Sequence, residues 1–284
     1  MDAAVEIKYL NIRNANGQSL VHNSSFCLRP GETYCLLGES GSGKTLTSKA
    51  ILGMLPADLQ MSGDVLLRGK NLNHLSKRDW RKVRGRHMSV IFQHPEQALH
   101  PALPIGRQLG DLMLSHLPVS RHEAEQQAAK MLSQVLLKDT EHVMKSYPHE
   151  LSGGMNQRVM IAMALLLKPE VVIADEPTSA LDVTTQAEVI SLLHHLITEL
   201  NMSMLFITHD ILLAGYLADT IGVMRDGEII EQGSAERILG QPEHEYTKQL
   251  CRYRSQRLLS KGGASPNASS AATIQRNEWK ANFE

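Results

Sequence analysis

Apolar and polar positions in the first part of the chain predict three strands and a helix. Val5 to Ile12 and Leu20 to Leu28 each predict a strand, and the polar segment between them, Asn14 to Gln18, predicts a turn. Thr33 to Leu37 is a short, mostly apolar run that is typical of a buried strand. Thr45 to Leu55 then predicts a helix close behind it.

The middle of the chain changes from strands to helices. Gly63 to Arg68 and Met88 to Phe92 predict two more strands, after which the pattern from Gln93 to about Leu167 looks helical. Within that stretch Ser120 and Glu123 have the spacing of a capping box, which satisfies free backbone N–H groups where a helix begins. We therefore expect a helical insertion here.

The last third alternates strand and helix again, which favours an α/β fold with a largely parallel central sheet. Asp226 and Gly227 stand between two apolar runs and predict a hairpin turn. The expected strands are Val171 to Ala174, Ser203 to Thr208, Ile221 to Met224 and Glu228 to Gln232, and the expected helices are Thr185 to Leu200 and Ile211 to Leu217.

Composition excludes several classes of protein. The 284 residues suffice for one large domain, while a formal net charge of −1 and only 4% aromatic residues argue against nucleic-acid binding. The segment Met1 to Ala4 lacks a basic region followed by an apolar run, so we expect no secretory signal, and no apolar stretch approaches the roughly 20 residues that span a bilayer. We therefore expect a soluble protein that needs a partner to associate with a membrane.

The cysteines indicate the redox compartment, and the composition of the tail indicates where the folded domain ends. Cys27, Cys35 and Cys251 form no CxxC pair, so we expect buried thiols in a reducing compartment. From Ser260 the chain is rich in Ser, Ala, Asn and Gly, which is typical of disorder. We expect one folded domain over residues 1–253, with a helical part at about residues 94–167, and a disordered tail over residues 254–284.

A glycine-rich segment joins the strand that ends at Leu37 to the following helix. Gly38-Glu39-Ser40-Gly41-Ser42-Gly43-Lys44-Thr45 fits the pattern G-x-x-x-x-G-K-[ST], in which backbone N–H groups surround phosphate oxygens. In such a loop Lys44 reaches the β- and γ-phosphates, and the Thr45 hydroxyl binds Mg²⁺. Because a chance match is expected in about one chain in a hundred, the segment predicts nucleotide binding.

Two carboxylates end a later strand. Asp175 and Glu176 follow the apolar run Val171 to Ala174. There Asp175 can hold Mg²⁺ through water, and Glu176 can polarise an attacking water molecule. A solvated acidic strand end is common, so the catalytic interpretation depends on the phosphate-binding loop being present too.

Two other polar residues follow predicted strands. Gln93 offers a neutral amide that can sense a γ-phosphate or a water molecule, and the His209 imidazole can reach a γ-phosphate and hold Glu176 and water in position. A surface glutamine and a structural histidine are the ordinary interpretations when each is taken alone, because the chain has 13 histidines.

Ser152-Gly153-Gly154 lies at the predicted start of a helix that includes Val159 to Leu167. The free N–H groups of a helix start suit a phosphate, although a capped helix start without a ligand is an alternative. A single ATP in a single subunit would not need this second surface.

Taken together, these segments resemble the nucleotide-binding subunits of ATP-binding cassette (ABC) transporters, from about Val5 to Tyr253 and in the family's order. The resemblance implies a P-loop NTPase core with a mostly parallel sheet, an antiparallel β-subdomain and an inserted α-helical subdomain. It assigns Walker A to Gly38 to Thr45, the Q-loop to Gln93, the signature to Leu151 to Gln157, Walker B to Val171 to Asp175, the catalytic base to Glu176, the D-loop to Ser179 to Asp182 and the switch histidine to His209.

The resemblance also implies cofactors and partners. ATP and Mg²⁺ are the expected cofactors, with Thr45, Gln93 and Asp175 (through water) as metal ligands. Ser152, Gly153 and Gly154 are expected to contact the ATP of a second cassette, usually a related but different subunit. Two permease subunits and an extracytoplasmic substrate-binding protein would complete an importer at the cytoplasmic face of a bacterial inner membrane, without nucleic acid.

Finer details resemble the oligopeptide, dipeptide and nickel importer group. Tyr147 to Met155 is close to that group's pattern, and His244-Glu245-Tyr246-Thr247 resembles its H-P-Y-T motif with Glu245 in place of proline. The stretch Asn14 to Gly17 lacks the aromatic residue that stacks on adenine in many cassettes, so the adenine contact is not identified. Cys251 alone does not make the iron–sulfur cysteine cluster of peptide-type members, which favours the nickel or metallophore branch.

Two other classes of function stay open. A soluble ABC ATPase that acts on nucleic acid or ribosomes is disfavoured by the single cassette, the near-neutral charge and the lack of a long coiled-coil insertion. A P-loop kinase or GTPase would have no use for Leu151 to Gln157. Among importer cargoes, peptides, nickel and metal–chelator complexes all stay possible.

Overall fold

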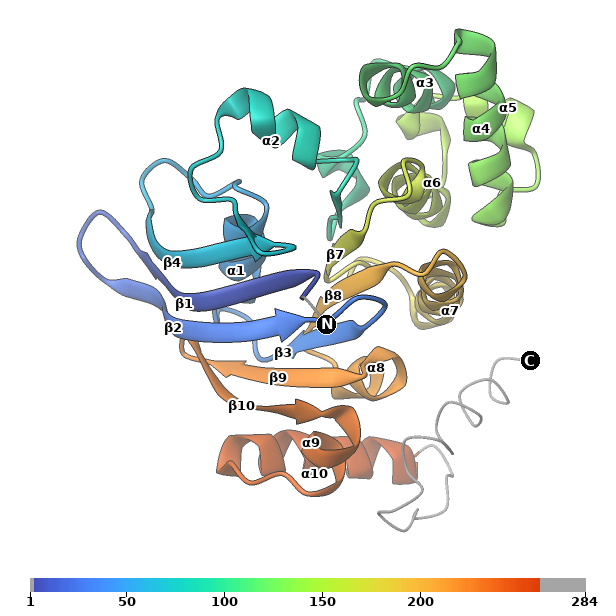
Figure 1. The fold of residues 1–284 in the computed structure, drawn as a ribbon. Helices are drawn as coiled ribbons and strands as arrows, with labels where there is room; N and C mark the ends of the chain where they lie inside the picture. The colour runs from blue at the N-terminus through green and yellow to red at the C-terminus, as the bar shows by residue number, and fades with distance from the viewer. Residues whose placement is uncertain (1–2, 261–284) are drawn as a thin grey trace. The chain divides into compact units, whose positions relative to one another are not determined.

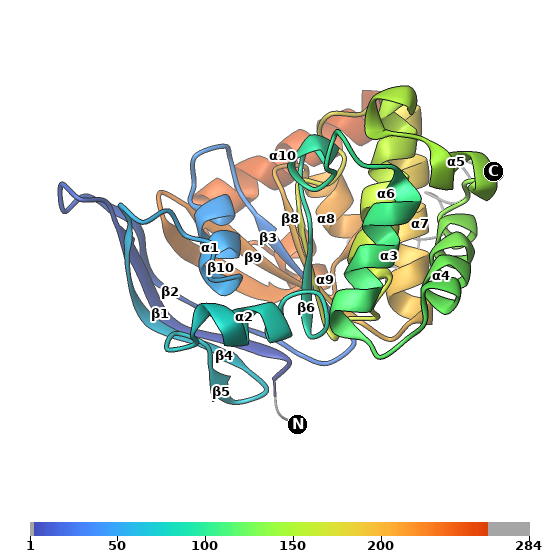
Figure 2. The same ribbon diagram turned by 90° about the horizontal axis from the view of Figure 1, so that it is seen from above.

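The computed structural model describes residues 3–260, which group into two compact units. One unit contains Met1–His74 and Ser203–Glu284, and the other contains Leu75–Met202. Figure 1 labels most of the helices and strands of both units, and Figure 2 also labels β5 and β6.

The first unit contains an antiparallel sheet in the order β2-β1-β4-β5. Residues along β1 alternate between buried and partly exposed until Tyr9, which is exposed, has a φ of 50° and lies at a register shift in the pairing with β2. This irregularity keeps Leu10 rather than Tyr9 in the buried face, which explains the weak alternation in the sequence. The strands are β1 (Val5–Arg13), β2 (Ser19–Leu28), β4 (Gln60–Leu67) and β5 (Lys70–Asn71).

A second set of strands in this unit surrounds β3 (Thr33–Leu37). β3 is parallel to β8 (Ser203–Thr208) on one side and to β9 (Thr220–Arg225) on the other, and β10 (Glu228–Ser234) is antiparallel to β9. Every residue of β3 and β8 is buried, as expected for strands that are covered on both faces. The helices of this unit are α1 (Lys44–Ile51), α8 (Ile211–Leu217), α9 (Ala235–Gly240) and α10 (Glu245–Ser260).

The second unit combines a parallel strand pair with helices. β6 (Met88–Ile91) is parallel to β7 (Val171–Asp175), and Ile91 lies opposite Ala174. Figure 2 shows α3, α4 and α6 beside one another, and α4 contacts both of the others. The helices are α2 (Lys77–Val83), η1 (Pro95–Gln97), α3 (Ile105–His116), α4 (Arg121–Gln134), α5 (Thr140–Lys145), η2 (Pro148–Glu150), α6 (Gly153–Leu165) and α7 (Val183–Glu199).

Most predicted elements are confirmed. β3, β8 and α8 have the predicted bounds, and both halves of the capping box at Ser120 and Glu123 are present. Asp226 and Gly227 have φ values of 48° and 86°, the pair of positive angles that a tight two-residue hairpin turn requires. The predicted α/β class with parallel strands and a separate antiparallel sheet is therefore correct.

Some predicted boundaries differ from the bounds of the helices and strands. The helix predicted to reach Leu55 ends at Ile51, because Gly53 takes a φ of 60° that breaks the helical turn. The segment from Gln93 is not helical at its start, because prolines interrupt it and the first α-helix begins at Ile105. The predicted disordered tail starts inside α10, which continues to Ser260, and residues 261–284 of that tail lie outside the described residues.

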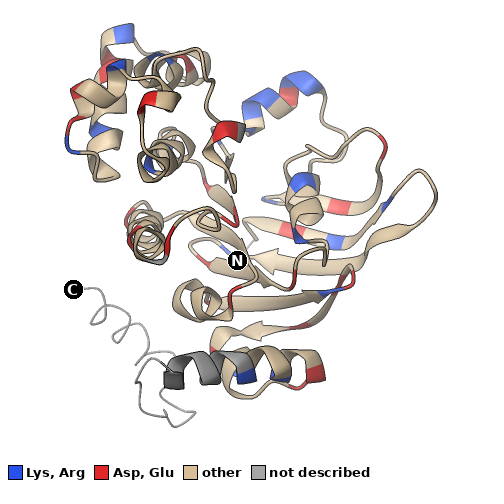
Figure 3. Ribbon diagram, turned by 180° about the vertical axis from the view of Figure 1, so that it is seen from behind, with Lys and Arg blue, Asp and Glu red and all other residues tan. Residues whose placement is uncertain are grey.

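Two further expectations need correction or addition. Cys35 is buried as predicted, whereas Cys27 is exposed and Cys251 is partly buried, since Cys27 lies on the outward face of β2. Helix α2 was not predicted because its sequence has no apolar stripe, the pattern that indicates a helix packed on a core. The structure agrees, since none of the residues of α2 is buried. The helix carries Lys77, Arg78, Arg81 and Lys82 beside one acid, which makes most of its ribbon blue in Figure 3. No helix in the described range 3–260 is long and apolar enough to cross a bilayer.

Candidate nucleotide-binding site

The glycine-rich loop forms the turn between β3 and α1. Gly41 and Gly43 have φ values of 84° and 104°, which favour glycine. A Cβ at Gly38 would lie 2.1 Å from the Met224 carbonyl oxygen, and a Cβ at Gly43 would lie 2.8 Å from Met224 Cε. Backbone angle and close packing against β9 therefore both require the glycines of this loop.

The Lys44 ammonium is enclosed by the loop that precedes it. The residue is 4% exposed, and its Nζ donates hydrogen bonds to the carbonyl oxygens of Gly38 at 2.8 Å and Glu39 at 2.7 Å. The first turn of α1 holds no acidic residue that would offset the positive end of the helix. The loop thus offers a buried cation and a helix start to an anion, with Thr45 exposed beside them.

His209 is linked to the same loop through the backbone. It is exposed and follows β8, whose last residue, Thr208, lies opposite Leu37 of β3. The N–H of Gly38 donates to the Thr208 carbonyl oxygen at 3.3 Å. The structure therefore brings the residue before His209 against the first residue of the phosphate loop.

The acidic strand end lies in the second unit. Asp175 is the last residue of β7 and is 8% exposed, while Glu176 is partly buried. Glu176 has a φ of 46°, an uncommon value for a residue with a side chain. Its carbonyl oxygen accepts hydrogen bonds from the N–H and the hydroxyl of Ser179, at 3.3 and 3.2 Å, which stabilise the turn after the strand.

Gln93 leaves the same edge of the strand pair as Glu176. Ile91 is paired with Ala174 in the parallel register, and Gln93 and Glu176 each follow that pair by two residues. The sequence interpretation of both residues as strand-end groups is confirmed, and Gln93 is exposed there.

Helix α6 begins after Ser152, as predicted. Ser152 is the N-cap, and its hydroxyl accepts a hydrogen bond from the N–H of Met155 at 3.3 Å. Ser152 and Gly153 are exposed. Apart from its own chain neighbours and helical turn, no heavy atom of the described residues lies within 4 Å of a Cβ placed at Gly153. The start of α6 is thus an open surface where free N–H groups can meet an anion.

A buried amide ties this helix to the segment after Glu176. Gln157 is 1% exposed, and its Nε2 donates a hydrogen bond to the carbonyl oxygen of Pro177. Arg158 beside it pairs with Glu188 of α7 at 2.8 Å. The sequence pattern alone does not reveal this contact, although a glutamine among the apolar residues of α6 is a signal for a buried amide with a defined partner.

The predicted site residues fall into two sets. Gly38 to Thr45 and His209 belong to the first unit, and Gln93, Ser152 to Gly154, Asp175 and Glu176 belong to the second. Thr45 in the first unit, and Gln93 and Asp175 in the second, each carry a side-chain oxygen of the kind that Mg²⁺ prefers, so their chemistry fits that ion. Within residues 3–260 no group of three or more His, Cys, Asp or Glu side chains could hold a metal ion.

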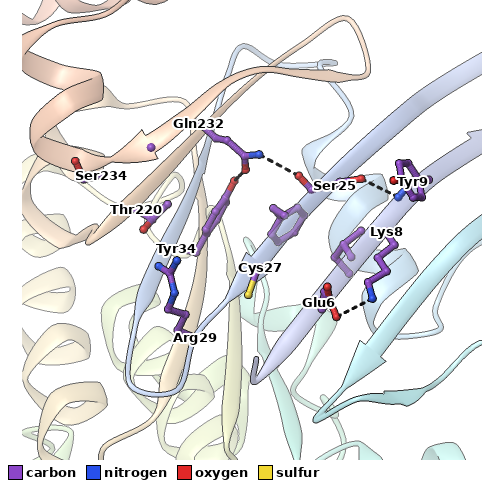
Figure 4. Close-up of a pocket in the computed structure, with 13 residues that line it drawn as sticks. Glu6, Lys8, Tyr9, Ser25, Cys27, Arg29, Tyr34, Thr220, Gln232 and Ser234 are labelled. Atoms are coloured by element: carbon purple, nitrogen blue, oxygen red, sulfur yellow. Dashed lines mark hydrogen bonds and ion pairs between the residues drawn. The ribbon is translucent and has the colours of Figure 1, made fainter. Parts of the chain in front are cut away.

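A cavity of about 580 Å³ also lies in the first unit (Figure 4). The Tyr34 hydroxyl donates to Gln232 Oε1 at 3.2 Å, and Gln232 Nε2 reaches the Ser25 carbonyl oxygen at 3.4 Å. Burial raises the pKa of the Tyr34 hydroxyl, so it stays a neutral donor. None of the predicted nucleotide-site residues lines this cavity.

Comparison with known proteins decides the family. The model of the ABC transporter family matches residues 21–179, more than half of the chain. The chain belongs to the ABC transporter family. The ABC transporter fold and the ATPase activity predicted from the sequence are therefore correct, and the kinase and GTPase alternatives are excluded.

Named relatives of this ABC ATPase include transport proteins. It is 47% identical to the peptidoglycan transport ATP-binding protein YejF of Agrobacterium fabrum, over 81% of this chain but 42% of that protein. It is 40% identical to the metal-staphylopine import system ATP-binding protein CntD of Staphylococcus aureus, over 86% of this chain and 90% of that protein. It is 43% identical to the dipeptide transport ATP-binding protein DppD of Bacillus subtilis, over 81% of this chain and 69% of that protein.

A solved structure agrees with the ABC fold. The ATP-binding cassette MJ0796, in a dimeric post-hydrolysis state bound to ADP and phosphate, has a TM-score of 0.71 and 26% identity to this chain. The similarity covers 81% of this chain and 98% of that one.

Proposed function

We propose that this ABC ATPase powers the import of a peptide, nickel or a metal chelate through partner membrane subunits. The proposal is carried by two separate features of the chain that suit an anion. One is the loop around Lys44, and the other is the open start of α6 at Ser152. The names of CntD and DppD support an importer over a soluble ATPase that acts on nucleic acid or ribosomes.

The first surface binds the chain's own ATP. The backbone N–H groups from Gly38 to Thr45 surround the phosphates, and Lys44 turns from the carbonyl oxygens of Gly38 and Glu39 to the β- and γ-phosphates. Thr45, Gln93 and Asp175 (through water) would hold Mg²⁺, and this ion would neutralise phosphate charge.

Hydrolysis depends on groups at the strand ends. Glu176 accepts a proton from the attacking water, and His209 holds Glu176 and this water in position. Gln93 senses the γ-phosphate and the water through its amide. The turn that Ser179 stabilises fixes the backbone of Glu176 in its uncommon conformation, which orients the carboxylate.

The second surface serves another cassette. Ser152, Gly153 and Gly154 donate to the ATP held in the Walker A loop of a related, non-identical subunit, so that ATP binding closes a head-to-tail pair. Two permease subunits and an extracytoplasmic binding protein complete the importer at the cytoplasmic face of a bacterial inner membrane. Closure of the pair then drives alternating access.

A mixed-dimer experiment tests the shared site. A chain with Ser152→Ala is assembled with the partner cassette, and turnover is measured separately at each Walker A site. Sharing predicts reduced turnover at the partner's site and normal turnover at the variant chain's own site. A defect confined to the variant chain's own site contradicts the proposal.

An uptake experiment tests the cargo. A strain that lacks the gene is supplied with labelled dipeptide, nickel or a metal–metallophore complex and is complemented with the wild-type or the Lys44→Ala chain. Uptake of one cargo should fall in the deletion strain and return only with the wild-type chain. The CntD similarity over 90% of that protein favours the metal complex. Unchanged uptake of all three would refute import of these classes.

A further inference from the structure

The start of α10 contacts the phosphate loop. Tyr246 is the second residue of α10 and is 5% exposed, and its hydroxyl accepts a hydrogen bond from the N–H of Glu39 at 3.3 Å. The carbonyl oxygen of the same peptide group, that of Gly38, accepts a hydrogen bond from Lys44 Nζ at 2.8 Å. The Gly38–Glu39 peptide is therefore held at its nitrogen by Tyr246 and at its oxygen by Lys44.

Tyr246 is itself held firmly. The guanidinium of Arg225 lies 4.8 Å from the centre of its ring, a distance at which a cation is attracted to an aromatic face. Its N–H donates to His244 Nδ1 at 3.1 Å. The buried carboxylate of Glu231 accepts the N–H groups of Glu243 at 2.8 Å and His244 at 3.1 Å, which fixes the segment before α10.

The loop and α10 also share a neighbour on β9. Arg225, which covers Tyr246, follows Met224, whose carbonyl oxygen packs so closely against Gly38 that no side chain fits there. Burial, and then the negative charge of Glu39, raise the pKa of Tyr246, so the hydroxyl stays uncharged at neutral pH. The first two residues of the phosphate loop thus lie against β9 and the tyrosine of the H-E-Y-T segment.

We propose that Tyr246 is a positioning residue that fixes the Gly38–Glu39 peptide and so orients the phosphate loop for nucleotide. This proposal rests on the proposed binding of nucleotide by Gly38 to Thr45. When Lys44 turns toward phosphate, the peptide loses its bond to the ammonium and keeps the bond to Tyr246. Because that contact does not involve the γ-phosphate, Tyr246 acts on the binding of ADP and ATP alike and takes no part in hydrolysis.

Tyr246→Phe in the full chain tests this role, because it removes the hydroxyl and keeps the ring under Arg225. We expect the Kd values for MgADP and MgATP to rise by the same factor, about two- to tenfold for one hydrogen bond, with unchanged turnover at saturating ATP. The matched control is Tyr34→Phe, which removes another buried tyrosine hydroxyl of the same unit that bonds to Gln232 instead of the loop. Thermal unfolding of both variants measures the purely structural cost, and Tyr34→Phe should leave nucleotide affinity unchanged.

A second variant covers the case in which Tyr246→Phe folds poorly. Arg225→Gln removes the cation that supports the ring and leaves the hydroxyl, so it should weaken both nucleotides by a smaller common factor. If neither variant weakens MgADP more than Tyr34→Phe does, while Lys44→Ala abolishes binding, the positioning role is overturned and the nucleotide site stands. If Lys44→Ala still binds nucleotide normally, the proposed nucleotide site itself fails.

Discussion

Gln157→Leu tests whether the signature helix and the segment after Glu176 act as one structural piece. The Gln157 amide is buried and donates to the carbonyl oxygen of Pro177, the residue after Glu176. Leucine has a similar volume, so the substitution opens little space, but it leaves the buried Pro177 carbonyl without this donor.

The expected loss of folding stability comes from the Pro177 carbonyl, which loses its hydrogen-bond donor. Leaving a buried acceptor without its partner costs about 1–3 kcal/mol. For a domain of this size each kcal/mol lowers Tm by roughly 2–4 °C, so Tm should fall by about 2–12 °C. Because the freed carbonyl lies beside Glu176, turnover at saturating MgATP should fall more than the affinity for MgATP.

Thermal unfolding and steady-state ATPase kinetics measure both effects. The control is Gln127→Leu, an exposed glutamine on α4 in the same unit, which should change stability by no more than about 0.5 kcal/mol. A Gln157→Leu protein with the Tm and turnover of the wild type would refute the coupling between the two segments.

Lys44→Ala should abolish nucleotide binding and turnover, because it removes the cation inside the phosphate loop, whereas Lys49→Ala on the same helix should leave binding intact; calorimetric titration with ATP distinguishes them. Glu176→Gln should keep ATP binding and stop hydrolysis, so that ATP holds a closed dimer visible by light scattering; wild-type turnover would exclude Glu176 as the base. Desolvation alone would raise the pKa of Glu231, but hydrogen bonds to its carboxylate, the largest from the N–H of Glu243, together with the charge of Arg237 outweigh it and lower that pKa. Ionised Glu231 therefore contributes to the free energy of unfolding. This contribution is complete above the pKa that Glu231 has in the unfolded chain, and it is lost as the pH falls through the lower pKa of the folded protein. Urea unfolding should therefore show a smaller loss of stability toward pH 3 in Glu231→Gln, and an unchanged loss would contradict this.

Patterns within a few residues predicted much of this fold. The apolar run Thr33 to Leu37 and the turn residues Asp226 and Gly227 encode local structure directly, and the structure confirms them. Order along the chain, together with the family resemblance, identified the phosphate loop and Ser152. Helix α2 gave no signal because it buries nothing, and the early end of α1 depends on a single positive φ at Gly53.

Contacts between distant residues could not be predicted. Tyr246 and Glu39 are 207 residues apart, and only the folded chain brings that hydroxyl to the phosphate loop. Gln157 and Pro177 are 20 residues apart on different elements, so a periodic pattern along α6 does not reveal their hydrogen bond. Long-range polar contacts of this kind position the site, whereas short-range patterns determine the elements.

The open space over Gly153 has a genetic consequence. Within the described residues, packing does not require glycine at this position, and alanine is the better helix former. A Gly153→Ala chain should therefore fold, bind ATP in its own Walker A loop and assemble with its partner subunits. If the ATP sites are shared as proposed, the substitution impairs only the ATP site of the partner cassette. In a cell that makes both the wild-type and the Gly153→Ala chain, the variant chains would enter the transporter complexes and inactivate them. The mutation would then be dominant over the wild-type allele.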